Sequence, residues 1–260
     1  MKDLIFEFNK IKSIIPKGST IYLEIDLIRL KNFFYKKNYK VVLEFLLTEF
    51  KKIIGKNGNL IVPAFTYSWG KDKNKKIFDV KKTLPKTGMF PNFLFLKKEV
   101  LRTNDPMFSF LILGKDKKKL STIGKSSFGK RSLFEKIDKD KTYLVSFGLE
   151  RFDPTFVHYV EEYFDTNYKK INYRFSKKYN GLFKKDNKFK KDFFYSFSRN
   201  LKLNMFYNEK KIKKILLKKK KLKIVNFHSF EVFITLARDF FNEGILGMKN
   251  DKFFFVKHRQ

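Results

Sequence analysis

The fold is decided by one stretch, TYLVSFGLERFDPTFVHYVEEYF, which runs from Thr142 to Phe164. Its first six residues give the clearest strand signal in the chain, a short apolar run. Gly148 follows that run, and Asp153 with Pro154 supplies the N-cap and first-turn proline that commonly open a helix. The stretch therefore predicts a strand, a short loop and a helix that begins at Asp153.

Working outward, the segments before this stretch alternate between helix and strand patterns. Helices are expected over 4–15, 41–54 and 89–96, strands over 19–23, 59–65 and 108–113, a polar break over 24–26 and a loop over 70–88. Strand, helix and strand at this spacing indicate a parallel sheet. We expect an α/β fold with three α/β/α layers around a mostly parallel or mixed central sheet.

Length and composition bound the class of protein. The 260 residues weigh 31.3 kDa and are 43% hydrophobic, which suits a single domain over 1–260 and excludes global disorder. Absence of cysteine excludes disulfides, thiolate metal sites and a cysteine nucleophile, and three histidines leave no metal centre to expect. No window is apolar enough to span a membrane, and Asp3 and Glu7 interrupt the N-terminal apolar stretch, so we expect a cytoplasmic protein.

The net charge of +33 would draw any polyanion toward the surface. Lysine is densest from Phe183 to Ile224, which we interpret as a peripheral excursion from the domain. That segment could be a solvated face, could hold the phosphates of an anionic small ligand, or could bind nucleic acid, the least favoured of the three. The sequence also allows a homodimer.

His158 is the candidate for acid–base chemistry. It lies one turn inside the predicted helix, with Glu161 and Glu162 three and four residues on, so either carboxylate can share its face. The helix macrodipole disfavours imidazolium and a carboxylate favours it, which leaves a base that titrates near neutral pH. The position also follows a parallel strand, where open α/β sheets bind ligands. The alternative is a packed helix residue satisfied by a neighbouring glutamate.

Taken in order, the segments resemble the aminoglycoside N(3)-acetyltransferase family over about residues 3–180. The resemblance is carried by nine ordered pieces: PKGST (16–20) after a helix, GNLIVPAFTYSW (58–69), Phe78-Asp79, KTGM (86–89), VLRT (100–103), Ser109-Phe110, Gly114-Lys115, SFG (127–129) with Ser132, and SFGLERFDPTFVHYVEEYF (146–164). The last piece is similar to the family's strand, loop and His-x-x-Glu helix.

The resemblance implies transfer of an acyl group, usually acetyl, from coenzyme A to a primary amine on a sugar-like acceptor. A thioester is already activated, so the missing cysteine is no obstacle. His158 would accept the amine proton as general base, and Glu161 would orient its ring. Acetyl-CoA is then the co-substrate, and no metal is implied.

Two departures bear on the acceptor. Residues 24–26 read Glu-Ile-Asp where antibiotic-modifying members have His-Ser-Ser, and 105–110 read DPMFSF where they have His-Pro-x-His-Ser-Phe. These variants resemble the branch associated with sugar and glycan modification. We therefore expect an amino sugar or a nucleotide-linked sugar as acceptor. The alternatives are an aminoglycoside 3-N-acetyltransferase conferring antibiotic resistance and a non-enzymatic polyanion or nucleic-acid binder.

Four residues are assigned to the acceptor by this resemblance. Asp26 and Asp105 would hold its ammonium or hydroxyls, and Arg102 would hold an anionic group, since its fork matches phosphate geometry. Glu162 would lie beside the acceptor or act as a second orienting carboxylate. Capping, turn chemistry and a structural ion pair are the competing explanations for the two aspartates and the arginine.

Four more residues are assigned to the acyl donor. Thr87 and Gly88 precede a predicted helix and could present amides to an anion, although no Walker pattern surrounds them. Ser109 and Thr155 could stabilise the oxyanion that forms at the thioester carbonyl.

Overall fold

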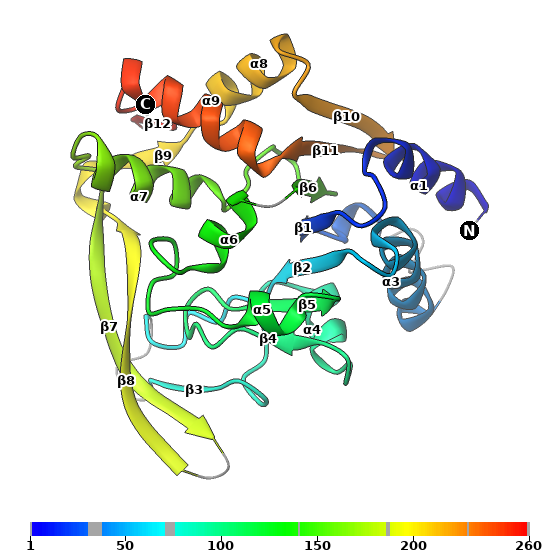
Figure 1. Cartoon of the computed structure of the whole chain (residues 1–260), viewed down its shortest axis with the longest axis horizontal. Helices are drawn as coiled ribbons and strands as arrows, with labels where there is room; N and C mark the ends of the chain where they lie inside the picture. Colours follow the sequence, from blue (N-terminus) through cyan, green and yellow to red (C-terminus); the bar gives the residue numbers. More distant parts are fainter. Residues whose placement is uncertain are drawn as a thin grey trace.

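The computed structural model describes residues 2–30, 38–70, 76–139, 141–185, 188–227 and 229–258. A seven-stranded mixed sheet with the order β10-β11-β6-β1-β2-β5-β4 forms its centre (Figure 1). The strands are β1 (Thr20–Ile25), β2 (Asn59–Pro63), β4 (Leu101–Arg102), β5 (Phe110–Gly114), β6 (Thr142–Phe147), β10 (Leu222–Phe227) and β11 (Phe230–Leu236). β1 pairs in parallel with β2 and β6, and the outer pairs are antiparallel, so the predicted mixed sheet is confirmed.

Helices cover both faces of the sheet, which makes three layers. One face carries α1 (Lys2–Ile14), α3 (Tyr39–Ile54) and α4 (Met89–Phe95). The other carries α5 (Lys117–Ser121), α6 (Leu133–Lys139), α7 (Val157–Asn167), α8 (Lys210–Lys218) and α9 (Ala237–Asn250). Because side chains alternate along a strand, Tyr22 and Leu144 pack under one layer while Leu23 and Val145 pack under the other. Because both faces of the sheet are buried, the sequences of these strands are nearly continuous apolar runs.

A long antiparallel hairpin extends away from the sheet (Figure 1). It consists of β7 (Arg174–Lys185) and β8 (Lys188–Arg199), with β3 (Ile77–Asp79) paired in parallel to β7. Trp69, Phe78, Met107 and Phe194 form a separate apolar cluster that attaches the hairpin to the loops of the domain. Gly181 permits this contact, because a Cβ there would lie 2.5 Å from the Trp69 ring.

The lysine-rich segment 183–224 is distributed over several elements. It begins near the tip of the hairpin and continues along β8, through η2 (Leu201–Leu203), β9 (Met205–Tyr207) and α8, into β10, an edge strand of the central sheet. β9 also pairs with β12 (Val256–His258). Within the described residues, no helix is long and apolar enough to cross a membrane.

Three local expectations are wrong. α7 begins at Val157 rather than Asp153, because Glu24 accepts a hydrogen bond from the Thr155 amide and the preceding residues form turns. The polar break at 24–26 is mostly strand, since Glu24 and Ile25 continue β1 alongside β6. The loop expected over 70–88 contains β3; its residues 71–75 lie outside the described part of the chain.

Candidate active site

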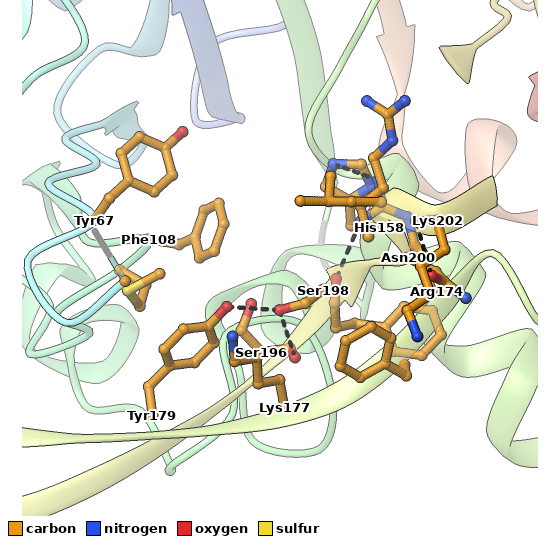
Figure 2. Close-up of a pocket in the computed structure, with 16 residues that line it drawn as sticks. Tyr67, Phe108, His158, Arg174, Lys177, Tyr179, Ser196, Ser198, Asn200 and Lys202 are labelled. Carbon is orange, nitrogen blue, oxygen red and sulfur yellow. Dashed lines mark hydrogen bonds between the residues drawn. The ribbon is translucent and has the colours of Figure 1, made fainter. Parts of the chain in front are cut away.

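A cavity of about 790 Å³ separates the β7–β8 hairpin from the loops around the sheet (Figure 2). Tyr67 from the loop after β2 and Phe108 from the turn before β5 lie at one end, and His158 from the first turn of α7 lies at the other. The remaining lining comes from the hairpin, η2 and two further loop residues: Gly70, Met107, Arg174, Phe175, Lys177, Tyr179, Ser196, Phe197, Ser198, Arg199, Asn200, Leu201 and Lys202.

His158 is held by a buried ion pair behind it. Its Nδ1 lies 3.0 Å from Glu161 Oε2, and the same oxygen lies 2.7 Å from Arg174 Nε. Arg174 Nη2 lies 3.3 Å from His158 Nε2, and its Nη1 donates to the Phe197 carbonyl. Because a guanidinium only donates, Nε2 is the acceptor and the proton belongs on Nδ1, facing Glu161.

These surroundings favour neutral imidazole. Burial lowers the pKa of His158, the Arg174 charge lowers it further, and Glu161 only partly opposes them. Burial raises the pKa of Glu161, but Arg174 and His158 outweigh it, so that this carboxyl stays ionised at 1% exposure. With 21% of its side chain exposed, His158 is a neutral base within reach of the cavity.

A second cavity of about 220 Å³ lies at the carboxyl ends of β1 and β2. Its lining is Glu24, Ile25, Val62, Pro63, Phe65, Thr87, Pro91, Leu149, Asp153 and Thr155. Glu24 accepts hydrogen bonds from the Tyr22 hydroxyl at 3.0 Å and the Thr155 amide at 2.9 Å. Burial raises the pKa of Glu24 to about 7 and that of Asp153 to about 6. His158 lines the first cavity and Thr155 lines the second, and the His158 amide donates to the Thr155 carbonyl at 3.1 Å.

The structure brings some of the predicted residues together. His158 and Glu161 are in contact at the first cavity, while Thr87 and Thr155 line the second. The Thr87 hydroxyl donates to the Pro63 carbonyl at 2.7 Å. Gly88 is the N-cap of α4, with φ of 107°, a conformation that suits glycine.

Arg102 and Ser109 line neither cavity, because other parts of the protein occupy their hydrogen-bonding groups. The Arg102 guanidinium lies between the rings of Phe78 and Phe95, and burial lowers its pKa to about 10. It donates to the Ala64 and Thr83 carbonyls and to the Ser109 hydroxyl, so its fork is already occupied by the protein. Ser109 is fully buried and donates in turn to the Ala64 carbonyl.

The three carboxylates assigned to the acceptor lie elsewhere. Asp26 caps the turn after β1 by accepting from the Ile28 amide. Asp105 is 1% exposed and accepts from the amides of Met107 and Phe108, so it stabilises a turn. Glu162 lines a separate cavity of about 560 Å³, where burial raises its pKa to about 7. Turn chemistry explains both aspartates, because short carboxylates readily accept neighbouring amides.

Sequence reasoning missed the residues that complete the first cavity. Arg174, Lys177 and Tyr179 lie on β7, in a stretch with no ligand motif, and line the cavity because the hairpin packs against the domain, where Arg174 contacts His158. The sequence pattern predicts that Glu24 belongs to a polar break after the strand. The feature that could have indicated a functional role for it is an acidic residue directly after the apolar run 19–23. His228, the third histidine with His158 and His258, lies outside the described residues.

Comparison with known proteins places this geometry in a family. Residues 37–248 match the sequence profile of aminoglycoside 3-N-acetyltransferase. No curated protein matches the chain by sequence search.

Solved structures share the fold at low sequence identity. A sisomicin-bound AAC-VIa structure superimposes with a TM-score of 0.73 at 14% identity, covering 95% of this chain and 98% of its own. AAC-IIIb in binary complex with CoASH superimposes with a TM-score of 0.75 at 13% sequence identity, and the match covers 94% of this chain and 95% of the AAC-IIIb chain. YokD from Bacillus subtilis superimposes with a TM-score of 0.72 at 14% sequence identity, and the match covers 94% of this chain and 97% of the YokD chain. Since the profile spans most of the chain, the protein is an N-acetyltransferase that belongs to the aminoglycoside 3-N-acetyltransferase family.

Proposed function

We propose that this protein transfers the acetyl group of acetyl-CoA directly to a primary amine of a sugar-like acceptor, with His158 as general base. The observation that carries the proposal is the neutral, partly exposed imidazole at the large cavity, held by Glu161 at 3.0 Å. Family membership supplies the reaction and its acyl donor. The orientation of His158 supplies the base that the reaction needs.

His158 would act through Nε2. As the amine nitrogen bonds to the thioester carbonyl carbon, Nε2 accepts the amine proton and the carbon–sulfur bond breaks. The proton then passes to the departing thiolate of coenzyme A, which leaves the base neutral again. Glu161 accepts from Nδ1 throughout and stabilises the transient imidazolium, while Arg174 must yield its weak 3.3 Å contact with Nε2 to the incoming amine.

We place the thioester at the second cavity and the acceptor in the first. Thr155 at the second cavity and His158 at the first are joined by a backbone hydrogen bond, so groups bound in the two cavities would lie near the same short segment, 155–158. Such positioning is worth as much as about 7–11 kcal/mol of the barrier, and a positioned base adds about 10²–10⁴-fold. Thr87 and Thr155, which line the second cavity, are then the hydroxyl side chains available to the donor, and Gly88 follows Thr87 as the N-cap of α4.

His158→Gln tests the proposal. We expect release of free coenzyme A thiol in the presence of an amine acceptor to fall by at least about 100-fold, because glutamine cannot accept the proton. The dissociation constant for acetyl-CoA should stay within about twofold. His258→Gln, the same change at an exposed histidine near the C-terminus, is the matched control and should leave turnover unchanged. Full turnover by His158→Gln would contradict the mechanism.

A further inference from the structure

We infer that the acceptor is an anionic amine, a sugar that carries a phosphate or diphosphate as well as its amino group. This inference rests on the proposed function and concerns the cavity beside His158. Four cationic side chains line that cavity, Arg174, Lys177, Arg199 and Lys202. None of its lining residues in the described part of the chain is acidic.

Three of these charges are available to a ligand. Glu161 pairs with Arg174 from behind, which leaves Lys177, Arg199 and Lys202 without an ion-pair partner among the described residues. Lys177 Nζ lies 5.0 Å from the Tyr179 ring centre, and the Arg199 guanidinium lies 4.4 Å over Phe206. Arg199 Nε is buried with no hydrogen-bond partner in the described structure. Aromatic rings hold these cations, and their donors are left for an anion.

The arrangement fits the chemistry of the reaction. Nearby cations lower the pKa of a bound amine, so more of it is present as the nucleophilic free base. The same cations repel an acceptor that carries several ammonium groups, as aminoglycosides do, and attract one that carries phosphate. A phosphate that lies away from the reacting nitrogen would therefore strengthen binding of the acceptor to these cations, while the amine stays in its free-base form.

The apolar surface and size of the cavity match a sugar with an attached group. Tyr67 and Phe108 face Tyr179 across the cavity, and ring faces of this kind stack on the apolar face of a sugar or on a base (Figure 2). About 790 Å³ exceeds the needs of a single hexosamine and lies within the range of cavities that hold larger small molecules.

Calorimetric titration of the full chain with matched ligands tests this inference. The probes are glucosamine, glucosamine 1-phosphate, UDP-glucosamine, kanamycin and, separately, acetyl-CoA. We expect the phosphorylated amino sugars to bind at least about tenfold more tightly than glucosamine and kanamycin. The double variant Lys177→Glu with Lys202→Glu should remove that preference and leave acetyl-CoA affinity within about twofold. Lys214→Glu with Lys218→Glu on α8 makes the same change in net charge away from the cavity and should leave it intact.

Three results would overturn the inference. First, kanamycin could bind more tightly than the sugar phosphates. Second, both double variants could weaken binding of the sugar phosphates equally, which would show that the preference comes from the overall charge of the protein. The Lys177 and Lys202 changes could instead weaken acetyl-CoA alone, which would make the cavity a coenzyme A site. If either of the first two occurs while thiol release still depends on His158, the proposed function stands and only the acceptor class is wrong; the third would also overturn the placement of donor and acceptor in the two cavities.

Discussion

At the scale of single residues, two buried carboxyls at the candidate site differ in their pKa shifts. Glu161 is ionised because Arg174 and His158 surround it, whereas Glu24 lies among groups that do not neutralise it. Burial raises the pKa of both, but Arg174 and His158 bring that of Glu161 below its ordinary value, whereas that of Glu24 rises to about 7. Each has a measurable consequence.

Replacing Glu161 by Gln should damage catalysis and folding together. Gln leaves Arg174 without its carboxylate, and because its amide can present either an acceptor oxygen or a donor NH2 to Nδ1, it no longer fixes the His158 tautomer. Breaking a buried pair in this way costs on the order of 3–5 kcal/mol, measurable as a lower urea midpoint. We expect kcat to fall and KM for acetyl-CoA to change little, measured under conditions where the variant is folded. A variant with wild-type kcat would show that Glu161 does not position the imidazole.

Glu24 should make the protein less stable as pH rises. Burial raises the pKa of Glu24 from 4.5 to about 7 in the folded state, so its contribution to stability is complete below pH 4.5 and is lost as pH rises through 7. Glu24→Gln keeps an acceptor for the Thr155 amide and carries no charge. At pH 8 it should be more stable than wild type by about 3 kcal/mol, and at pH 4.5 the two should match. Equal melting temperatures at pH 8 would argue against a raised pKa.

At the scale of elements, the hairpin is the part of the fold that makes the large cavity. β7 and β8 contribute half of its lining residues, and the contact of Gly181 with Trp69 helps to hold them against the domain. Ring contacts reinforce the attachment, with Trp69 4.9 Å from Phe183 and Phe78 5.9 Å from Phe183 between ring centres. This apolar joint, together with the pairing of β3 with β7 and the ion pair of Lys125 with Asp192, positions the hairpin at the large cavity.

Gly181→Ala should loosen that joint. The added Cβ would lie 2.5 Å from the Trp69 ring, so the ring or the hairpin must move, at a cost of about 1–3 kcal/mol. Trp69 is the sole tryptophan of the chain, so its fluorescence reports the change, and we expect a red shift together with a higher KM for the acceptor. Asn180→Ala, at the exposed neighbouring position, is the control and should leave emission unchanged. An unaltered spectrum for Gly181→Ala would contradict this account of the hairpin.

At the scale of the whole molecule, a net charge of +33 must be separated from the specific basic cavity. A surface with this excess attracts any polyanion, and that attraction weakens steeply as salt is added. Specific binding of a donor to a shaped site combines charge with contacts that salt does not screen. Salt dependence therefore distinguishes the two.

Acetyl-CoA should protect the protein from thermal unfolding at moderate salt. At a ligand concentration 100 times the dissociation constant the stabilisation is about 2.7 kcal/mol, which raises the melting temperature by roughly 5–10 °C for a chain of this size. Binding of duplex DNA, measured by fluorescence anisotropy in the same buffers, should vanish between 50 and 200 mM salt, a range in which affinities resting on phosphate contacts fall by about 10³–10⁵-fold. Salt-resistant DNA binding without protection by acetyl-CoA would favour a polyanion-binding protein.

The sequence by itself determined the layers of this protein and its central chemical pair. Apolar runs separated by amphipathic helices specify which surfaces are buried, and His158 and Glu161 are three residues apart on one helix, so local geometry alone brings them together. The tertiary structure decided which other side chains meet them. Arg174 reaches the imidazole through the pairing and attachment of a hairpin, and the Glu24 contact with Thr155 joins residues 131 positions apart.

The same reason bears on the residues assigned to ligands from the sequence, which remain predictions. Arg102, Asp26 and Asp105 carry suitable charges, but backbone groups already form hydrogen bonds with each of them, among them carbonyls that reach Arg102 only when distant segments pack around it. A local pattern reports what a side chain can do within a turn or two of its own position. Whether its donors and acceptors are already occupied depends on contacts between distant segments, and those exist only once the chain has folded.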